Sequence, residues 1–289
     1  MADIKTQLVG TVAALHRYPV KSMLGETLAT GTVSTRGIAG DRAFALIDAA
    51  TGNVASAKRP QLWRSLLGCT ARTDAVTGAI SVRLPGGSEH AAGSGALDTI
   101  LSSLTTRGVW LSQVPPEGAA LERSHPEAVL AEGFDATVGT DSLTMGQGAP
   151  AGTFMDFAPL HLITSATLAA LSSALPDGPV EAIRYRPNIV IDSLPGVSGF
   201  PENDWLEGAL RIGADVVVKV ILSSPRCAIP TLAHGALPSR PGALRAAIAL
   251  NTVDIPGFGV QPCAGVYAAV LSGGAIRVGD AVTFEAGMR

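Results

Sequence analysis

The chain has 289 residues, enough for one large domain or two ordinary ones, and 47% hydrophobic with 16% charged residues is the composition of a folded globular protein. The net charge of −3 argues against a general basic surface for nucleic acid or anionic membranes, so any bound anion must be held by a local basic cluster. The N-terminus lacks the pattern of a signal peptide, and no apolar run reaches the roughly 18 residues of a membrane span.

The first third of the chain is predicted to be rich in short strands. Residues 8–20 form an apolar run that ends at Pro19, because proline fixes φ and lacks an N–H donor. Short strands with glycine turns between them are typical of a small barrel. The further strands are expected at residues 27–33, 43–48, 66–73 and 79–84.

The signal is weaker in the middle of the chain. Glycine- and proline-rich loops dominate from residue 85 to 150, with one helix predicted over 95–105. We therefore predict an N-terminal β-barrel domain over 1–140, of which 85–140 is an irregular connecting region, and a second domain over 141–289.

The second half alternates between strands and helices. Thr164 or Ser165 is expected to cap a helix that runs to about Ala174, and Ser239 to cap a helix over 240–250. Together with the first third, this pattern predicts a β-rich α+β fold: a barrel-like N-terminal domain packed on a second barrel with a few helices. The strands of this half are expected at 187–192, 208–212, 215–222, 266–271 and 281–284.

Cys227 follows the most β-branched stretch of the chain. Val216 to Ile221 predict a buried strand, and Pro225 and Pro230 stiffen the loop that carries the thiol. A thiol held in one place beside Arg226 is biased toward the thiolate, which suits a metal ligand or a nucleophile. A buried cysteine with a purely structural role is the alternative.

The cysteines also restrict the type of site. There are three, none in a CxxC pair, which excludes a zinc ribbon and a four-thiolate iron–sulfur cluster within the chain. A sparse, odd set of cysteines is typical of a reducing compartment, so we expect a cytoplasmic protein. Cys69 and Cys263 are expected to be core or loop residues without a role.

Several basic and hydroxyl side chains occur at strand ends. Lys21 and Ser22 follow the first strand, and Arg42 and Arg186 lie in or beside turns. Lysine offers a point charge, arginine a planar fork for phosphate oxygens, and a helix that starts near Thr164 would add free N–H groups. These residues predict a phosphate site, unless each one is simply solvated at the surface.

Five short motifs resemble one family when taken together and in this order. The chain resembles proteins that join a MOSC N-terminal β-barrel domain to a MOSC domain, a group that includes the mitochondrial amidoxime reducing component and bacterial relatives. The resemblance spans about residues 8–84 and 154–286. The motifs are Tyr18-Pro-Val-Lys-Ser22, Gly37-Ile-Ala-Gly-Asp-Arg42, Arg186-Pro-Asn-Ile-Val190, Ser224-Pro-Arg-Cys227 and Arg277-Val-Gly-Asp280.

The resemblance implies a molybdenum cofactor (Mo-molybdopterin) between the two domains, and it does not imply pyridoxal phosphate. In the family, the cysteine that matches Cys227 ligates molybdenum through its thiolate, a soft ligand suited to this metal. The residues that match Lys21, Ser22 and Arg42 hold the phosphate and pterin of the cofactor.

Other site residues are implied with less detail. Arg186 and Asn188 are expected to line the same cleft from the second domain, and Thr164 to bring a hydroxyl near the phosphate. Asp156 matches an acidic position of the family close to the site and is expected to be catalytic together with Cys227. Arg226 is expected to steady the metal-bound thiolate.

The family activity is reduction of N-hydroxylated compounds to amines or amidines. The resemblance thus implies a molybdenum-dependent reductase of a small N-hydroxylated substrate that cleaves N–O or S–O bonds. Nothing else in the chain could store the electrons, so a separate donor is expected: ferredoxin, flavodoxin or a cytochrome b5-like protein with a reductase. Neither a nucleic-acid partner nor a membrane span is expected.

The chain departs from the family after the ligand cysteine, where Thr231-Leu-Ala-His234 replaces the common Thr-Val-Asp-Pro. This altered loop is expected to affect substrate range, and His234 is expected to be solvated, although it could donate a proton. Two other functions stay open. One is a carrier of the cofactor or of sulfur on Cys227, and the other is a cysteine hydrolase that pairs Cys227 with His161 or His234.

Overall fold

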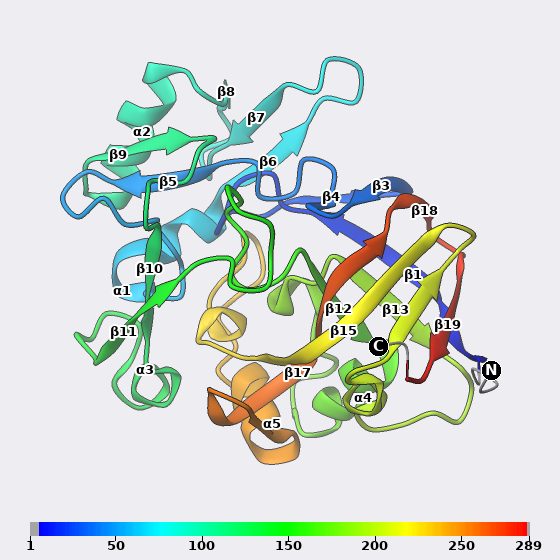
Figure 1. Ribbon diagram of the computed structural model, residues 1–289. Helices are drawn as coiled ribbons and strands as arrows, with labels where there is room; N and C mark the ends of the chain where they lie inside the picture. Colours follow the sequence, from blue (N-terminus) through cyan, green and yellow to red (C-terminus); the bar gives the residue numbers. More distant parts are fainter. Residues whose placement is uncertain (1–5, 288–289) are drawn as a thin grey trace.

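A computed structural model describes residues 6–287, in which seven strands close a barrel. The strand order is β12–β13–β1–β19–β14–β15–β17, and β17 pairs back onto β12 (Figure 1). All neighbours are antiparallel except β12 and β13. The barrel strands are β1 (Thr6–Arg17), β12 (Leu160–Thr164), β13 (Ile189–Ser193), β14 (Ala209–Ile212), β15 (Val216–Pro225), β17 (Gly259–Ser272) and β19 (Ala281–Glu285).

The first strand of the chain is part of this barrel. β1 lies between β13 and β19, where Gly10 faces Ser193 on one side and Val282 on the other. A Cβ at Gly10 would lie 2.1 Å from the carbonyl oxygen of Asp192, so a residue with a side chain would push the strands apart. The barrel therefore combines β1 with strands from the second half of the chain. The predicted division between residues 140 and 141 stays a prediction.

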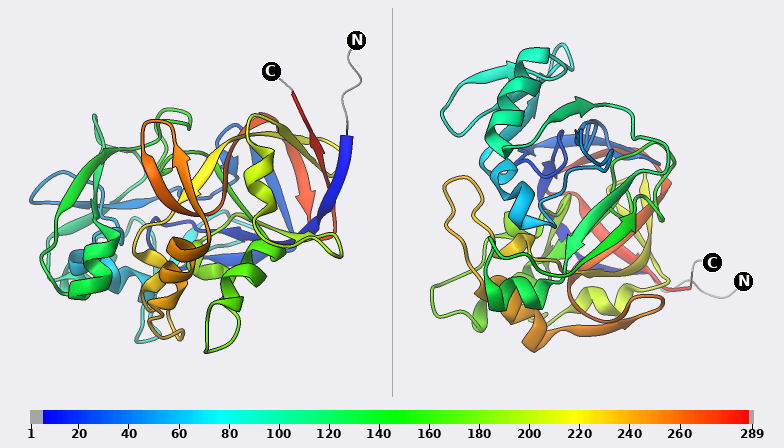
Figure 2. Two further views of the ribbon diagram at one scale, coloured as in Figure 1. Left: turned by 90° about the horizontal axis from the view of Figure 1, so that it is seen from below. Right: turned by 90° about the vertical axis from the view of Figure 1, so that its left-hand side faces the viewer.

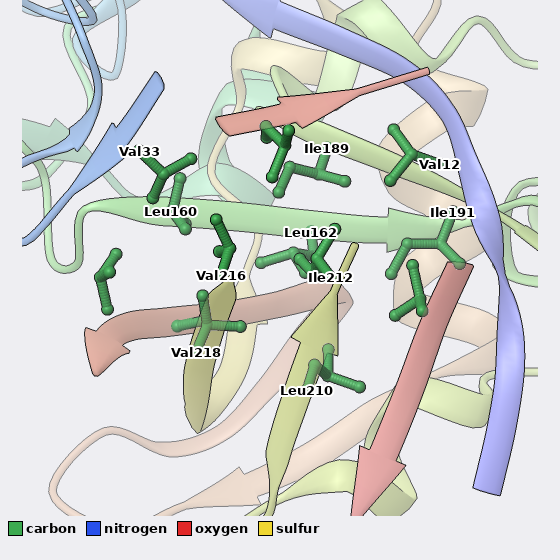
Figure 3. Packing of buried hydrophobic residues seen from close by; sticks show 14 of the residues in the cluster. Val12, Val33, Leu160, Leu162, Ile189, Ile191, Leu210, Ile212, Val216 and Val218 are labelled. Atoms are coloured by element: carbon green, nitrogen blue, oxygen red, sulfur yellow. The ribbon is translucent and has the colours of Figure 1, made fainter. Parts of the chain in front are cut away.

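The barrel interior is filled by aliphatic side chains (Figure 3). On β12, Leu160 and Leu162 point into the barrel, whereas Ile163 packs outward against the helix-covered face. Because successive side chains of a strand alternate between its faces, a strand buried on both sides carries apolar residues on both. Leu162 and Ile163 of β12 and the valines at the start of β15 show this pattern. Each fully buried aliphatic side chain contributes about 1.5–3 kcal/mol to stability.

Two helices cover the outside of the barrel, α4 (Ser165–Ser173) and α5 (Gly242–Leu250). The predicted cap of α4 is confirmed, because the Thr164 hydroxyl accepts a hydrogen bond from the N–H of Thr167 at 3.1 Å. The predicted Ser239 cap of α5 is wrong. Pro241 takes the N-cap position with φ already helical, and its side chain has no oxygen that could accept a hydrogen bond from the first turn.

Residues 45–144 form a second lobe, which we call the small-sheet lobe. Figures 1 and 2 show this lobe beside the barrel. It contains two small sheets, a two-stranded ribbon and the helices α1, α2 and α3. Its own core includes Leu46, Leu66, Leu97 and Leu101. Its elements are β5 (Ala45–Asp48), α1 (Pro60–Trp63), η1 (Arg64–Gly68), β6 (Thr70–Thr73), β7 (Ile80–Arg83), β8 (Glu89–Ala91), α2 (Gly95–Thr105), β9 (Val109–Ser112), β10 (Ala120–Ser124), α3 (Pro126–Glu132) and β11 (Thr140–Thr144).

Short elements complete the structure. A three-stranded sheet joins β18 to β3 and β4, and β2 and β16 extend the barrel sheet. The predicted β-rich α+β class with a barrel and a few helices is confirmed. The remaining elements are β2 (Glu26–Leu28), β3 (Thr30–Ser34), β4 (Gly37–Ile38), η2 (Ala182–Tyr185), η3 (Pro201–Trp205), η4 (Ile229–Thr231), β16 (Thr252–Ile255) and β18 (Gly274–Arg277).

The region 85–140 is more regular than the sequence suggested. Besides the predicted helix, it contains three further strands and α3. These strands have three to five residues and pair in narrow, half-exposed sheets, so their apolar periodicity is too short to be seen in the sequence. Within residues 6–287, no helix is both long enough and apolar enough to cross a bilayer.

Candidate functional site

A cleft of about 700 Å³, its open mouth included, lies between the barrel and the small-sheet lobe. Ser56 and Lys58 reach it from the small-sheet lobe, and the other side chains come from the barrel and its loops. The cleft is lined by Lys21, Ser22, Arg42, Ser56, Lys58, Asp156, Ala158, His161, Arg184, Tyr185, Arg186, Asn188, Pro225, Arg226, Cys227, Ile229, Pro230 and Tyr267.

The charge of this cleft is opposite to that of the whole protein. Six of its side chains are cationic and only Asp156 is a carboxylate, although the chain carries a net charge of −3. Cations close together in a partly buried cleft repel one another, and an anionic ligand relieves that repulsion. The cleft is therefore suited to an anion.

Backbone pairing fixes Lys21 and Arg42 at the wall of the cleft. The N–H of Lys21 donates to the carbonyl of Phe44 at 2.9 Å, and the N–H of Phe44 donates to Pro19 at 3.0 Å. The N–H of Arg42 donates to the carbonyl of Tyr18 at 2.7 Å. Residues 18–21 and 42–44 thus run side by side, and this pairing brings together two motifs that are far apart in sequence.

Backbone strain is concentrated in the same place. Among residues 6–287, five non-glycine residues have positive φ, and three of them line the cleft: Ser22 at 64°, Arg42 at 47° and Arg186 at 56°. A left-handed conformation costs an ordinary residue about 1–2 kcal/mol. Such strain persists only where surrounding contacts enforce it, and it is frequent at functional sites.

Asp41 is the buried carboxylate that organises this wall. Its side chain accepts hydrogen bonds from the N–H of Tyr18 at 2.7 Å and from the Asn188 amide at 3.0 Å, and it pairs with Arg42. Burial opposes the charge of Arg42, but Asp41 outweighs it and raises the pKa of the guanidinium. Arg42 is therefore a permanent cation aimed by its neighbour.

Tyr18 holds two of the arginines. Its fully buried ring lies 5.0 Å from the Arg42 guanidinium and 4.3 Å from that of Arg186, within the range of cation–π contacts. Arg186 donates through Nη1 to the carbonyl of Met23 at 2.7 Å, but its buried Nη2 has no partner among residues 6–287. Burial lowers the pKa of Arg186 to about 10. An unsatisfied guanidinium nitrogen in a cationic cleft is a vacant donor for an anion.

Lys21 and Lys58 share one carboxylate, Asp156. The ammonium of Lys21 pairs with Asp156 and also donates to the carbonyl of Phe154 at 3.0 Å, while Lys58 lies 3.3 Å from the other carboxylate oxygen. Burial lowers the pKa of Lys21 to about 8, although Asp156 acts against it. Burial disfavours ionisation of Asp156, but the two lysines outweigh it and hold the carboxyl pKa below its usual range. Asp156 is thus an ionised bridge between two cations.

Cys227 lies half-buried on the loop that follows β15. The N–H of Arg226 donates to Pro262 at 2.8 Å, which anchors the loop to β17, and η4 follows directly. The Arg226 guanidinium donates to the carbonyl of Tyr185 at 3.1 Å and to Ser224. Arg226 therefore holds the loop that presents the thiol.

Seven of the predicted cofactor residues line this one cleft, but Thr164 does not. The Thr164 hydroxyl donates to Glu202 at 3.0 Å, and Glu202 also accepts from the Thr164 N–H at 2.9 Å and the Thr167 hydroxyl at 2.6 Å. A buried carboxylate thus already covers the N-terminus of α4. Asn188 lines the cleft while its amide braces Asp41.

The two histidines considered for a cysteine hydrolase are both buried. His161 lines the cleft, but its Nε2 lies 3.1 Å from the carbonyl of Ala264, and burial lowers its pKa well below the ordinary value. His234 was expected to be solvated, which is wrong. It is 2% exposed behind η4, and burial lowers its pKa to about 4. Neither is placed as an effective base for Cys227.

Sequence reasoning missed Lys58 as well as the supporting roles of Tyr18 and Asp41. The last two stand inside motifs that the sequence analysis quoted, but their side chains act by packing and pairing rather than by facing a ligand. Lys58 follows Ser56 in a loop without a predicted element, and the sequence carries no signal for its approach to Asp156.

The donors of the cleft fit a molybdenum cofactor. The cofactor is anionic through its phosphate and dithiolene, and its metal takes soft ligands. Lys21, Arg42 and the unpartnered Nη2 of Arg186 supply charge-assisted donors. The Ser22 hydroxyl accepts from the N–H of Ala57 at 3.0 Å, so its own proton remains available, and Cys227 supplies the thiol.

Two family models match the chain. Residues 9–104 match the MOSC N-terminal beta barrel domain, and residues 150–283 match the MOSC domain. All the residues that line the cleft lie in these two segments, with Lys21 and Arg42 in the first and Arg186 and Cys227 in the second.

Curated relatives are distant. The chain is 34% identical to mitochondrial amidoxime reducing component 2 of Rattus norvegicus over 134 residues, which is 45% of this chain and 37% of that protein. It is 27% identical to mitochondrial amidoxime-reducing component 1 of Homo sapiens over 303 residues, covering 96% of this chain and 83% of that protein. The match thus spans little more than a third of the rat protein.

A solved structure of similar length also matches. The crystal structure of the YUAD protein from Bacillus subtilis superposes over 99% of this chain and 100% of that chain, with a TM-score of 0.45 and 8% identity.

Proposed function

This chain belongs to the proteins that join a MOSC N-terminal β-barrel domain to a MOSC domain, and we propose that it is a molybdenum-cofactor-dependent oxidoreductase. Its substrates are N-hydroxylated compounds, from which it removes the oxygen, and S–O bonds are a secondary target. The names of the curated relatives support this class of reaction.

One observation carries the proposal: a half-buried thiol faces a cleft of six cationic side chains, one of which has a vacant buried donor. A hydrolase has no use for so many cations, whereas an anionic cofactor with a soft metal needs both the cations and the thiolate. The left-handed backbone at Ser22, Arg42 and Arg186 is unfavourable in free energy, and such strain is frequent where residues are held in place for a bound group.

Each residue has a defined task in this proposal. Lys21, Ser22, Arg42 and Arg186 would hold the phosphate and pterin, and Cys227 would ligate molybdenum. Asn188 and Arg226 are positioning residues, since one braces Asp41 and the other fixes the thiol loop. When bound, the cofactor would supply the two-electron redox chemistry.

The overall reaction consumes two electrons and two protons. The N–O bond of R–NHOH breaks, R–NH₂ forms, and the oxygen leaves as water. A reduced electron-transfer protein supplies the electrons: a ferredoxin, a flavodoxin or a cytochrome b5-like protein with its reductase. The three cysteines are all unpaired, which supports a reducing, cytoplasmic setting for this exchange.

Lys58 is a protonated group that lines the cleft together with the thiol. It lies beside Cys227, and although burial acts against its charge, Asp156, Tyr267 and Cys227 together raise its pKa. Lys58 therefore keeps its proton at neutral pH and can donate it to the departing oxygen, after which solvent restores it. Asp156 stays ionised, so it positions Lys58 rather than donating a proton itself.

A carrier of the cofactor or of sulfur is the second candidate. The half-buried thiol beside an open cleft mouth would equally allow transfer to a docked protein. Turnover separates the two functions, because a carrier binds metal without reducing a substrate.

Metal analysis with reduction of benzamidoxime by dithionite-reduced viologen tests the proposal. Protein from a cofactor-competent host should contain about one molybdenum per chain, and Cys227→Ala should lower reduction to the background rate. Cys263→Ala, which removes a buried cysteine outside the cleft, is the control and should keep activity. Metal-free protein that still turns over benzamidoxime would contradict the proposal, and metal-loaded protein without turnover would favour the carrier.

A further inference from the structure

A second chamber opens on the other side of Cys227. It shares five residues with the cationic cleft: Lys58, Asp156, Pro225, Cys227 and Tyr267. Its empty space is about 540 Å³, its open mouth included, which is within the range of small-molecule sites. The two chambers therefore meet at the thiol, and a molecule in the second chamber would lie next to whatever Cys227 holds.

The walls of the second chamber are aromatic and apolar, unlike those of the first. Phe157 lies edge-on to Phe258, with ring centroids 5.9 Å apart, and is tilted against Tyr267 at 5.7 Å. Leu143 and Leu222 complete the apolar lining. Phe258 belongs to the turn between β16 and β17 and is 37% exposed, so its ring is in contact with both the chamber and solvent. Flat aromatic groups stack favourably against such rings.

The chamber also carries a cation without a carboxylate partner. Arg123 of β10 donates to the carbonyl of Arg226 at 3.2 Å, so its guanidinium lies next to the loop of Cys227. The guanidinium also donates to the side-chain oxygen of Gln261 at 3.4 Å. Within residues 6–287 it forms no ion pair, and its buried Nε has no hydrogen-bond partner. Lys58, in contrast, is paired with Asp156. The charge of Arg123 is thus available to a ligand of the aromatic chamber.

We propose that this chamber is the substrate subsite and that it selects flat aromatic N-hydroxylated compounds that carry an anionic substituent. This inference rests on the function proposed above. Phe157 and Phe258 contact the aromatic ring, Arg123 binds the anionic substituent, and the N–O group points toward Cys227 and Lys58. Phe258 is a specificity-determining residue that also closes the outer side of the chamber.

Steady-state kinetics with three substrates test the selection. Benzamidoxime is neutral and aromatic, 4-carboxybenzamidoxime is anionic and aromatic, and acetamidoxime is small and aliphatic. Phe258→Ala should raise KM about threefold to tenfold for both aromatic compounds and leave acetamidoxime unchanged. Arg123→Gln should raise KM about tenfold for the carboxylated compound alone, and Arg123→Lys should retain part of the preference. For all of these variants kcat should change little.

Matched control variants show whether a change in KM comes from the chamber or from substitution of any exposed residue. Val260→Ala alters an exposed apolar residue two positions beyond Phe258, and Arg72→Gln removes an exposed cation of β6; neither lines the chamber. Both should leave all three KM values unchanged. Molybdenum content per chain shows whether the Cys227 loop is intact in the Arg123 variants, since Arg123 also holds that loop.

Calorimetric binding to the oxidised protein, without an electron donor, gives a second measurement that needs no turnover. The order 4-carboxybenzamidoxime, benzamidoxime, acetamidoxime, from tightest to weakest, and its loss in Phe258→Ala and Arg123→Gln would support the subsite. If binding follows this order but no compound is reduced, the proposed function fails and the subsite stands. If all three compounds are reduced and the variants change neither KM nor binding, the subsite is overturned.

Discussion

The barrel interior and the cationic cleft are built on opposite principles. The interior is filled by a cluster of apolar side chains, most of them fully buried and aliphatic. The cleft, one strand away, buries Lys21, Arg184, Arg186 and Arg226 almost completely. Burial of apolar surface stabilises a fold, whereas burial of cations without anions destabilises it. Stability is therefore concentrated in the barrel, and the cleft is held in place by it.

Two features of the cleft are energetically unfavourable in the absence of an anion. Burial lowers the pKa of Lys21 to about 8 and that of Arg186 to about 10, which means that the charged forms are disfavoured there. Three of its residues also adopt left-handed backbone conformations. A site that is unfavourable when empty and favourable with an anion is typical of functional sites, where stability and activity conflict.

A substitution in the barrel should give the largest loss of stability. Leu162 is fully buried in the interior, and Leu162→Ala should lower the free energy of unfolding by about 2–5 kcal/mol because it leaves a cavity. Urea denaturation measures this change. Leu271→Ala, at an exposed position of β17, should change it by less than about 0.5 kcal/mol. Similar losses for the two variants would contradict the comparison.

Acid should destabilise the cleft side through its buried histidines. The folded pKa of His234 is about 4, below the ordinary 6.5, so the unfolded chain binds more protons between these values. Its contribution is therefore present above about pH 6.5 and lost as pH falls toward 4, by at most about 3 kcal/mol. His161 acts in the same direction.

Unfolding free energies from pH 7.5 to 4.5 measure this loss. His234→Gln should flatten the curve between pH 6.5 and 4.5, whereas the exposed His125→Gln should leave its shape as in the original protein. An unchanged slope in His234→Gln would show that the buried imidazole is not the group that titrates.

Removal of a buried cation from the cleft should weaken cofactor binding while changing the stability of the fold little. Lys21→Met should weaken cofactor retention by about 1.5–3 kcal/mol, since it deletes a charge-assisted donor, and change the unfolding free energy of the metal-free protein by less than about 1 kcal/mol. Molybdenum per chain after extensive dialysis and urea denaturation give the two values. Lys219→Met removes a half-exposed lysine of β15 as the control. A large loss of stability in Lys21→Met without loss of molybdenum would show that Lys21 stabilises the fold rather than binding the cofactor.

The smallest effect concerns backbone strain at Ser22. Because its φ is 64°, Ser22→Gly should be more stable than Ser22→Ala by about 1 kcal/mol, although both lose the hydroxyl that accepts from Ala57. In strand β7 the order should invert, and Ser81→Gly should be less stable than Ser81→Ala by about 0.5–1 kcal/mol. If the glycine variant were the more stable one, or the less stable one, at both positions, backbone strain at Ser22 would be refuted.

Local patterns predicted several parts of the site. The β-branched run before Cys227 and its prolines gave the strand and the loop that carry the thiol, and Thr164 was identified as a helix cap. The basic motifs were predicted to converge, and they do. The sequence did not predict Lys58, the Tyr18 contacts or the role of Asp41. A lone lysine in a loop or a buried ring belongs to no periodic pattern, so its spatial neighbours cannot be inferred from the sequence.

The sequence by itself determined the β-rich class, the helices α2, α4 and α5, the thiol loop and the chemical types of the site residues, because these depend on neighbours along the chain. Only the tertiary structure decided that β1 closes the barrel with strands more than 170 residues away, and that Asp156 bridges Lys21 and Lys58. It also decided that a second, aromatic chamber meets the cleft at Cys227. Such contacts are set by long-range packing and by how buried charges find partners, and neither leaves a periodic signal in the sequence.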